Sequence, residues 1–239
     1  FTWAGNSPQN QITGWSNDPV SDTPCEVIYI RDEDTGEIWG ATPNPIRAAK
    51  SSYVARHGQG YSVFTHESRG IALELTQFVP LEDPVKISRL KLVNRTGRPR
   101  RLTVTAYVEW TLGATRGATV SAIVTQIDPE TSAFFARNPQ HPEFAGHVAF
   151  IDLLGVQRSW TGDRTEFLGR NGGLGRPAAL AADAPLSKLV GGGLDPCGVL
   201  QTEVRLAPNA QGEVVVALGQ TTDALSAQAL VEKCRAADL

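Results

Sequence analysis

The run of residues 53–79 constrains the fold of this chain more than any other stretch. It holds three β-rich segments, residues 53–57, 61–67 and 71–79, separated by glycine-containing turns. Short runs of aromatic and β-branched residues joined by such turns are typical of antiparallel strands in a meander. The run therefore predicts an antiparallel sheet at the centre of the fold.

The composition and charge of the chain exclude several other classes of protein. The chain has 239 residues, of which 41% are hydrophobic and 20% charged, so it can bury a large core. Its net charge of −3 comes without a basic run, which argues against nucleic acid as a partner. No apolar run approaches the roughly 20 residues that span a bilayer, so we expect no membrane insertion of this segment.

Cysteines, histidines and sequence motifs indicate neither a metal site nor a catalytic centre. Cys25, Cys197 and Cys234 lie far apart, without a C-x-x-C motif. This pattern favours three buried or half-buried thiols in a reducing compartment over disulfides or a zinc site. The four histidines lack metal-ligand spacing, and nucleophile and phosphate-binding motifs are absent. We therefore expect no metal, no cofactor and no catalytic residue in this chain.

Further β-rich segments continue the pattern along the chain. We expect hairpins that pair residues 25–31 with 37–41, 85–94 with 102–110, 120–127 with 132–137, 147–153 with 156–160, and 200–206 with 213–218. Residues 161–197, rich in glycine, proline and alanine, predict a long loop. Residues 223–237 predict a helix capped by Thr221 or Thr222. The predicted fold class is all-β, a large antiparallel sandwich with a C-terminal helix.

Three segments combine aromatic rings with hydrogen-bonding side chains, namely residues 15–18, 56–61 and 160–164. The apolar faces of sugar rings stack on aromatic side chains, while sugar hydroxyls bond to polar ones. The segments therefore predict contacts with a carbohydrate. The alternative is that Trp15 and Trp160 are packing residues of the sandwich. The candidate sugar-contacting residues are Arg56, His57, Gln59, Tyr61, Trp15 and Asp18.

A family resemblance rests on six segments that include these three. The segments are residues 1–7, 15–22, 29–36, 56–61, 105–110 and 160–170, in that order along the chain. Together they resemble the N-terminal β-domain of glycoside hydrolase family 94, formerly glycosyltransferase family 36. The family includes cellobiose and chitobiose phosphorylases, and the resemblance is strongest to the phosphorylase-like region of cyclic β-1,2-glucan synthases. It covers nearly the whole chain.

The resemblance implies a super-sandwich of the galactose-mutarotase type over residues 1–220. It also implies that the helix over residues 221–239 starts a linker to an (α/α)₆ barrel. In the family the barrel carries the general-acid aspartate and the phosphate-binding residues, so no catalytic residue is carried over and this chain alone is expected to be inactive.

The implied role is that of a carbohydrate-binding accessory domain of a glucan-processing glycosyltransferase or phosphorylase. The turn at residues 56–61 would line the sugar site. The implied partners are a glucan or oligosaccharide, the barrel of the parent chain, and a second copy in a homodimer. The expected location is cytoplasmic, with the parent protein tethered to the inner membrane.

Two other functions are compatible with the sequence. Sandwiches of this type also host sugar epimerases, and an autonomous aldose-epimerase (mutarotase)-like enzyme needs a histidine acid and a glutamate base on one concave face. The candidates are His57 or His66 as the acid, with Glu67, Glu74 or Glu109 as the base. The second alternative is a purely structural domain that mediates dimerisation.

Overall fold

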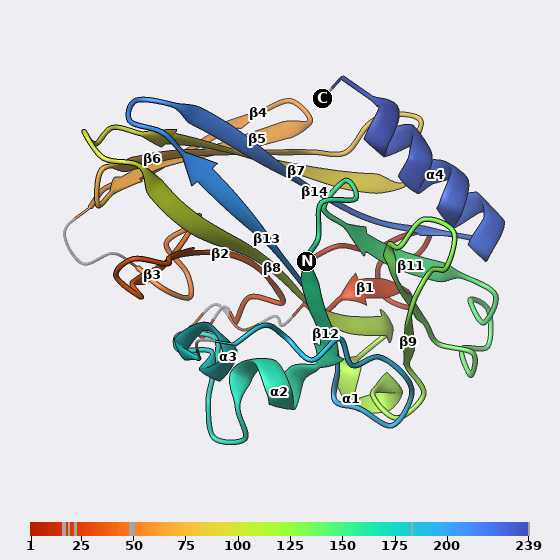
Figure 1. Ribbon diagram of the computed structural model, residues 1–239. Coiled ribbons are helices and arrows are strands. Elements are labelled where there is room, and N and C mark those ends of the chain that lie inside the picture. Colours follow the sequence, from red (N-terminus) through yellow and green to blue (C-terminus); the bar gives the residue numbers. More distant parts are fainter. Residues whose placement is uncertain (16–17, 19, 22, 48–50, 183, 239) are drawn as a thin grey trace.

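The computed structural model describes residues 1–15, 18, 20–21, 23–47, 51–182 and 184–238. Within them the chain forms two antiparallel sheets packed as layers (Figure 1). The larger sheet contains, in order across it, β4 (Tyr53–Gly58), β5 (Tyr61–Ser68), β6 (Ile71–Phe78), β7 (Val85–Asn94), β14 (Gln211–Thr221), β11 (Val148–Asp152), β10 (Phe134–Arg137) and β9 (Val124–Ile127). The smaller contains β12 (Ser159–Asp163), β13 (Pro196–Leu206), β8 (Arg100–Gly113), β2 (Glu26–Asp32) and β3 (Ile38–Gly40), with β1 (Gln11–Thr13) beside β8. The predicted all-β sandwich is confirmed.

The main core lies between the two sheets. Along β6 and β8 every second side chain enters it, as the two-residue period of a strand requires. Leu73 and Leu75 of β6 reach it from the larger sheet, and Val104 and Ala106 of β8 from the smaller. The alternating apolar residues of the sequence therefore specify the layer packing.

A charge pair also joins the two sheets. Lys86 of β7 donates to the carboxylate of Glu26 on β2, which accepts the hydroxyls of Thr2 and Thr13 at 2.6 and 2.5 Å. Burial alone would raise the pKa of Glu26, but the Lys86 ammonium and the hydrogen bonds from Lys86 and Thr13 lower it to about 2. At neutral pH the carboxylate is therefore ionised and links the layers.

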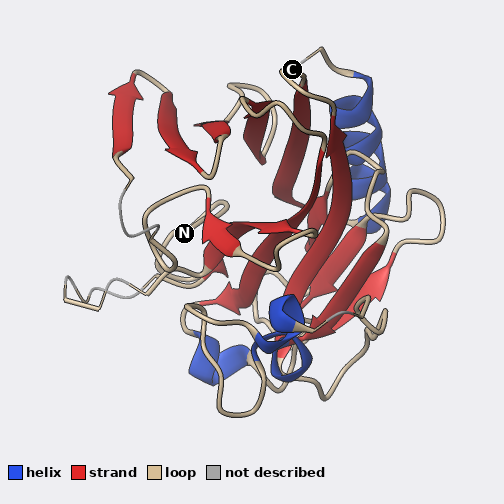
Figure 2. Cartoon of the chain, turned by 60° about the vertical axis from the view of Figure 1, so that its left-hand side comes forward, coloured by secondary structure: helices blue, strands red, loops and turns tan. Residues whose placement is uncertain are grey.

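Helices cover parts of the outer faces of the sandwich. α4 (Ala224–Ala236) packs on the larger sheet through Ala227, Leu230 and Val231. α2 (Arg164–Leu168) and α3 (Ala178–Ala181) cover part of the smaller sheet through Phe167 and Leu180, and α1 (Arg116–Thr119) follows β8. In Figure 2, α4 lies along one side and the short helices gather at the lower end. Of the helices in the described part of the chain, none has the length and apolar character needed to cross a membrane.

The predicted central meander is confirmed. β4, β5, β6 and β7 are neighbours in sequence order, and β4 forms an edge of the larger sheet. In this register His57 lies opposite Ser62, and His66 opposite Leu73. The predicted pairing of β2 with β3 and of β9 with β10 is also confirmed, although β9 begins only at Val124.

Three of the predicted hairpins are wrong. β7 does not pair with β8, β11 does not pair with β12, and β13 does not pair with β14, because each time the chain passes from one sheet to the other. A short polar turn between two β-rich runs occurs both in hairpins and in such crossovers. The local pattern therefore predicted the strands correctly and their partners incorrectly.

Asn94 fixes two of these crossovers at once. Its side chain is fully buried, and Nδ2 donates to the carbonyls of Arg98, Leu206 and Ala207 at 2.8, 3.3 and 2.9 Å. The first carbonyl belongs to the β7–β8 connection, and the other two lie at the end of β13 and the start of its connection to β14. One amide therefore holds both connections at the same end of the sandwich.

The stretch predicted as a long loop, residues 161–197, contains regular structure. β12 runs to Asp163, whose side chain accepts the N–H of Thr165 at 2.9 Å and caps α2. α3 follows, with Leu180 buried against the smaller sheet. These helices have five and four residues, too few to show a helical repeat of apolar residues in the sequence.

The C-terminal helix is present as predicted, with a different cap. Asp223, rather than Thr221 or Thr222, accepts the N–H of Ser226 at 2.9 Å. Thr221 is instead the last residue of β14. The apolar face of α4 packs on the larger sheet.

The three cysteines are free thiols. Cys25 is half-buried, and Cys197 and Cys234 are buried. Burial raises the pKa of Cys25 and of Cys234 to about 11. At neutral pH these two thiols are therefore protonated, which makes them weak nucleophiles.

Candidate functional site

The turn predicted to contact sugar, residues 56–61, is the tip of the β4–β5 hairpin, at an edge of the larger sheet. Successive side chains of a strand point to opposite faces, so Arg56 and His57 point apart. His57 shares the inner face with Ser62 and Phe64. Its Nδ1 lies 2.9 Å from the hydroxyl of Ser62, and its ring meets Phe64 edge-on at 6.0 Å. The hairpin tip therefore presents its candidate residues on two faces.

Two glycines shape the hairpin tip. A Cβ on Gly58 would lie 2.3 Å from the Tyr61 ring, so glycine here leaves room for the ring to lie over β4. Gly60 has φ +79°, a conformation that glycine adopts without strain. Tyr61 is 50% exposed, and Arg56 and Gln59 are exposed as well. The tip is thus a surface with one aromatic ring and several polar groups.

Trp15 and Asp18 behave differently from each other. The Trp15 ring is 56% exposed and stacks on Phe1 with centroids 5.5 Å apart. The Asp18 carboxylate accepts the hydroxyl of Ser21 at 2.5 Å and the N–H of Val20 at 2.9 Å, and these hydrogen bonds lower its pKa. Positions 16 and 17 of this predicted segment, and positions 19 and 22 of the segment 15–22 that carries part of the family resemblance, lie outside the described residues. Trp15 offers a ring face, whereas the Asp18 oxygens are engaged in their own turn.

The third predicted segment, residues 160–164, serves packing. Trp160 is half-buried against the inter-sheet core. Arg164 lies 3.0 Å from Glu109 and 3.4 Å from Asp195, and Arg116 pairs with the same two acids. These four charges join β8, α1, α2 and the residue that precedes β13. Arg164 and Asp163 of this segment therefore make contacts that support the fold.

The acid and base of an epimerase-like mechanism do not converge. His57 and His66 point to the inner face of the larger sheet, and burial lowers the pKa of His66. Glu67 and Glu74 alternate onto the outer face of that sheet, and Glu109 lies on the outer face of the smaller one. None of these candidate histidines therefore shares a face with a candidate glutamate.

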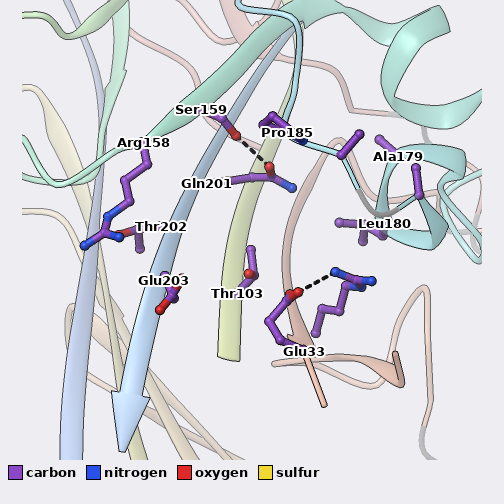
Figure 3. A pocket seen from close by; sticks show the side chains of 13 residues that line it. Glu33, Thr103, Arg158, Ser159, Ala179, Leu180, Pro185, Gln201, Thr202 and Glu203 are labelled. Carbon is purple, nitrogen blue, oxygen red and sulfur yellow. Dashed lines mark hydrogen bonds and ion pairs between the residues drawn. The ribbon is translucent and has the colours of Figure 1, made fainter. Parts of the chain in front are cut away.

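A pocket that was not predicted from the sequence lies on the outer face of the smaller sheet (Figure 3). Its volume is about 320 Å³. Figure 3 shows polar side chains of the strands on one side and the apolar Ala179, Leu180 and Pro185 on the other. The charged and polar residues that line this outer-face pocket include Arg31, Glu33, Thr103, Arg158, Ser159, Gln201 and Glu203.

Strand register assembles the outer-face pocket. Arg31, Thr103 and Glu203 lie side by side across β2, β8 and β13. In the next row Gln201 lies opposite Ser159 and accepts its hydroxyl at 2.7 Å. The same face continues into the apolar cluster beneath α2 and α3. The pocket therefore forms where the cover of these helices ends.

Two buried atoms of the outer-face pocket have no hydrogen-bond partner among the described residues. They are Nε of Arg31 and Oε1 of Glu33, whose other atoms pair with each other at 2.6 Å. A hydrogen bond from Arg205 lowers the pKa of the Glu203 carboxyl, so this side chain is also charged. Both unpartnered atoms are buried, so a molecule in the pocket does not contact them.

The sequence carried a weak indication of this pocket. Thr103 and Thr105 in β8, and Gln201 and Glu203 in β13, place polar side chains at alternate positions, which marks a polar strand face. That pattern does not say which strands adjoin. The pocket became visible only with the register of β2, β8 and β13.

The two-sheet fold and its residue pattern define the chain as an antiparallel super-sandwich. The model of the family described as "Glycosyl hydrolase 94, supersandwich domain" matches residues 1–237. The chain belongs to this family, and the resemblance found in the sequence is confirmed.

Individual relatives agree with this assignment. The chain is 31% identical over 236 residues to the cyclic beta-(1,2)-glucan synthase NdvB of Rhizobium meliloti (strain 1021), covering 99% of this chain and 8% of the synthase. It is 25% identical over 229 residues to the N,N'-diacetylchitobiose phosphorylase of Vibrio furnissii, covering 90% of this chain and 28% of that protein. The chain therefore spans less than a third of either relative. A solved polysaccharide lyase shares the fold, with a TM-score of 0.55 and 8% identity over 96% of this chain and 31% of the lyase.

Proposed function

We propose that this chain is a carbohydrate-binding accessory domain of a glucan-processing protein, and that catalysis belongs to other parts of the parent. In this proposal the hairpin tip lines a sugar site through Arg56, His57, Gln59 and Tyr61, with Trp15 and Asp18 as further contacts. A catalytic (α/α)₆ barrel completes the site, and α4 leads toward it as the start of a linker. Membership of the family and the glucan synthase among its relatives support this role.

One observation carries the non-catalytic part of the proposal. The histidines and glutamates that could serve as acid and base lie on different faces of the sandwich. General acid–base catalysis needs both groups within hydrogen-bond reach of one substrate. Exposed aromatic and polar groups at the hairpin tip suit recognition of a sugar.

Ligand-observed NMR of the 239-residue chain tests this proposal. We expect saturation transfer to β-1,2-linked glucan oligomers, and less to cellobiose and glucose. Because the site is completed elsewhere, the affinity is expected to be weak, and a millimolar Kd corresponds to only about −4 kcal/mol. Titrations therefore extend to tens of millimolar.

Two double variants locate the contact. Arg56→Ala/Tyr61→Ala is expected to weaken the transfer, and Arg170→Ala/Leu81→Ala, which also removes an exposed arginine and an exposed apolar side chain, is expected to leave it unchanged. Equal transfer in all three proteins would refute a sugar contact at the hairpin tip.

A second role, in assembly, is favoured by the exposed edge strand. β4 is an edge of the larger sheet, and its last five residues are exposed. Edge strands present unpaired backbone groups to another chain. A homodimer through this edge predicts that Val54→Pro lowers the dimer fraction of the parent in analytical ultracentrifugation. An unchanged dimer fraction would exclude this edge as the interface.

A further inference from the structure

We propose that the outer-face pocket is a second ligand site, and that its ligand is a neutral saccharide of one or two hexose units. This inference goes beyond the proposed role of the hairpin tip, because it concerns the other sheet and other residues. It rests on the chemistry of the pocket lining.

The polar groups of the pocket lining suit a ligand that carries several hydroxyls. The hydroxyl of Thr103 and the amide of Gln201 line the same open space, and each can bond to a ligand hydroxyl. Arg31 and Glu33 also line it and pair with each other, and the atoms that this pair leaves unpartnered are buried.

The balance of charge argues against an ionic ligand. Among the described residues, Arg31 and Arg158 contribute two positive charges to the lining, and Glu33 and Glu203 two negative ones. An anion drawn to the arginines would lie close to the carboxylates and be repelled by them. A cation drawn to the carboxylates would be repelled by the arginines. A neutral polar ligand avoids both repulsions.

The shape of the pocket suits a sugar ring. Ala179, Leu180 and Pro185 form an apolar wall that can contact the CH face of a pyranose, and the strands opposite supply the polar groups. A volume of about 320 Å³ lies at the lower end of the range for small-ligand pockets, about 300–1,000 Å³. It therefore accommodates a short saccharide and excludes the body of a long glucan.

The test is an NMR titration of the 239-residue chain with the β-1,2-linked glucose disaccharide, and separately with cellobiose, inorganic phosphate and putrescine. We expect a disaccharide to shift the methyl signals of Thr103 and Leu180. Phosphate and putrescine are expected to leave them in place. Shifts caused by phosphate or putrescine and by neither disaccharide would overturn the proposal, as would the absence of any shift up to tens of millimolar.

A matched pair of variants tests the location. Ala182→Tyr places a ring at the mouth of the pocket, whereas Ala181→Tyr places one on the neighbouring exposed residue of α3, outside the lining. We expect the first to weaken disaccharide binding about tenfold or more, and the second to leave it unchanged. Equal affinity of the two variants contradicts the proposal, and thermal unfolding of both confirms that they are folded.

A gentler variant tests the hydrogen bonds. Thr103→Val keeps the shape of the side chain and removes its hydroxyl, so we expect binding to weaken about threefold to tenfold. The double variant Arg56→Ala/Tyr61→Ala separates the two sites. It is expected to remove sugar-induced shifts at the hairpin tip and to keep those of Leu180. If the Leu180 shifts disappear with the hairpin tip, the pocket is not an independent site.

Discussion

The hairpin tip gathers its polar side chains from six consecutive residues, 56–61, whereas the outer-face pocket gathers them from several strands of the smaller sheet. The first is exposed and stands at a sheet edge. The second is concave and partly buried, with an apolar wall. The difference shows that a local cluster of polar residues in a sequence indicates a surface, while concavity depends on register between distant strands.

The largest effect is expected where the outer-face pocket meets the core. Asp32 is buried, pairs with buried Arg100, and accepts the N–H groups of Asp34 and Thr35, so it fixes the turn that carries Glu33. Asp32→Ala leaves a buried guanidinium unpaired and is expected to lower the free energy of unfolding by about 3–5 kcal/mol. Urea denaturation followed by circular dichroism measures this.

The control for this prediction is Asp34→Ala in the same turn. Asp34 is exposed and lies 3.8 Å from Arg101, so its loss is expected to cost less than about 0.5 kcal/mol. If both variants lowered the free energy of unfolding by the same amount, the buried Asp32–Arg100 pair would not stabilise the turn that carries Glu33.

The next largest effect is expected at Glu26. Through Lys86 it links the smaller sheet, which carries the outer-face pocket, to the larger sheet, which carries the hairpin tip. The pKa of Glu26 is lowered to about 2, so its stabilising effect is complete above about pH 5 and is lost as the pH falls from about 4.5 toward 2. Glu26→Gln is expected to lower the free energy of unfolding by about 2–3 kcal/mol at pH 7, with the difference from the unmodified chain vanishing near pH 2. Chemical denaturation at a series of pH values measures the difference, and a difference independent of pH contradicts the assignment.

A smaller effect is expected at Gly60, where a substitution tests the backbone conformation of the hairpin tip without changing side-chain packing. Gly60 has φ +79°, and a methyl group added to its Cα would have no atom within 4 Å. Gly60→Ala is therefore strained by its backbone alone and is expected to cost about 1 kcal/mol. Gly97 has equally free surroundings without a positive φ, so Gly97→Ala is the control, expected to be neutral or slightly stabilising in thermal unfolding. Equal costs would show that the tip is not held in its turn conformation.

The smallest effect is expected from the exposed arginine of the hairpin tip. Arg56→Ala is expected to change the free energy of unfolding by less than about 0.5 kcal/mol, because the side chain is exposed. Arg31→Ala in the outer-face pocket is expected to cost about 1 kcal/mol, since Arg31 is largely buried and bonded to Glu33. Urea denaturation measures both changes in the free energy of unfolding. Similar changes would contradict the distinction between the exposed hairpin tip and the partly buried outer-face pocket.

The same contrast between neighbouring and distant residues explains which parts of the fold could be predicted from the sequence. The meander of β4 to β7 could be predicted because each strand pairs with the next one along the chain. The partners of β8 could not, because β2 and β13 lie far from it in sequence and no local pattern distinguishes a hairpin from a crossover. The short helices α2 and α3 were missed for lack of a repeat.

For the candidate site, too, the local sequence was informative only about neighbouring residues. Residues 56–61 were found together because they are consecutive, yet the alternation of the strand places Arg56 and His57 on opposite faces. The polar composition of residues 160–164 indicated a ligand, whereas Arg164 and Asp163 serve an ion-pair cluster and a helix cap. Composition alone does not distinguish a polar group that binds from one that supports the fold.

The buried amide of Asn94 has a practical consequence for producing this domain. Asn94, Arg95 and Thr96 form the acceptor pattern for N-linked glycosylation. A glycan on Nδ2 would leave that nitrogen one hydrogen for the three carbonyls it now reaches, and the site has no room for an oligosaccharide. A host that sends the chain through its secretory pathway would therefore modify the nascent polypeptide at the residue that both sheet crossovers require, and expression without such modification is the route to folded protein.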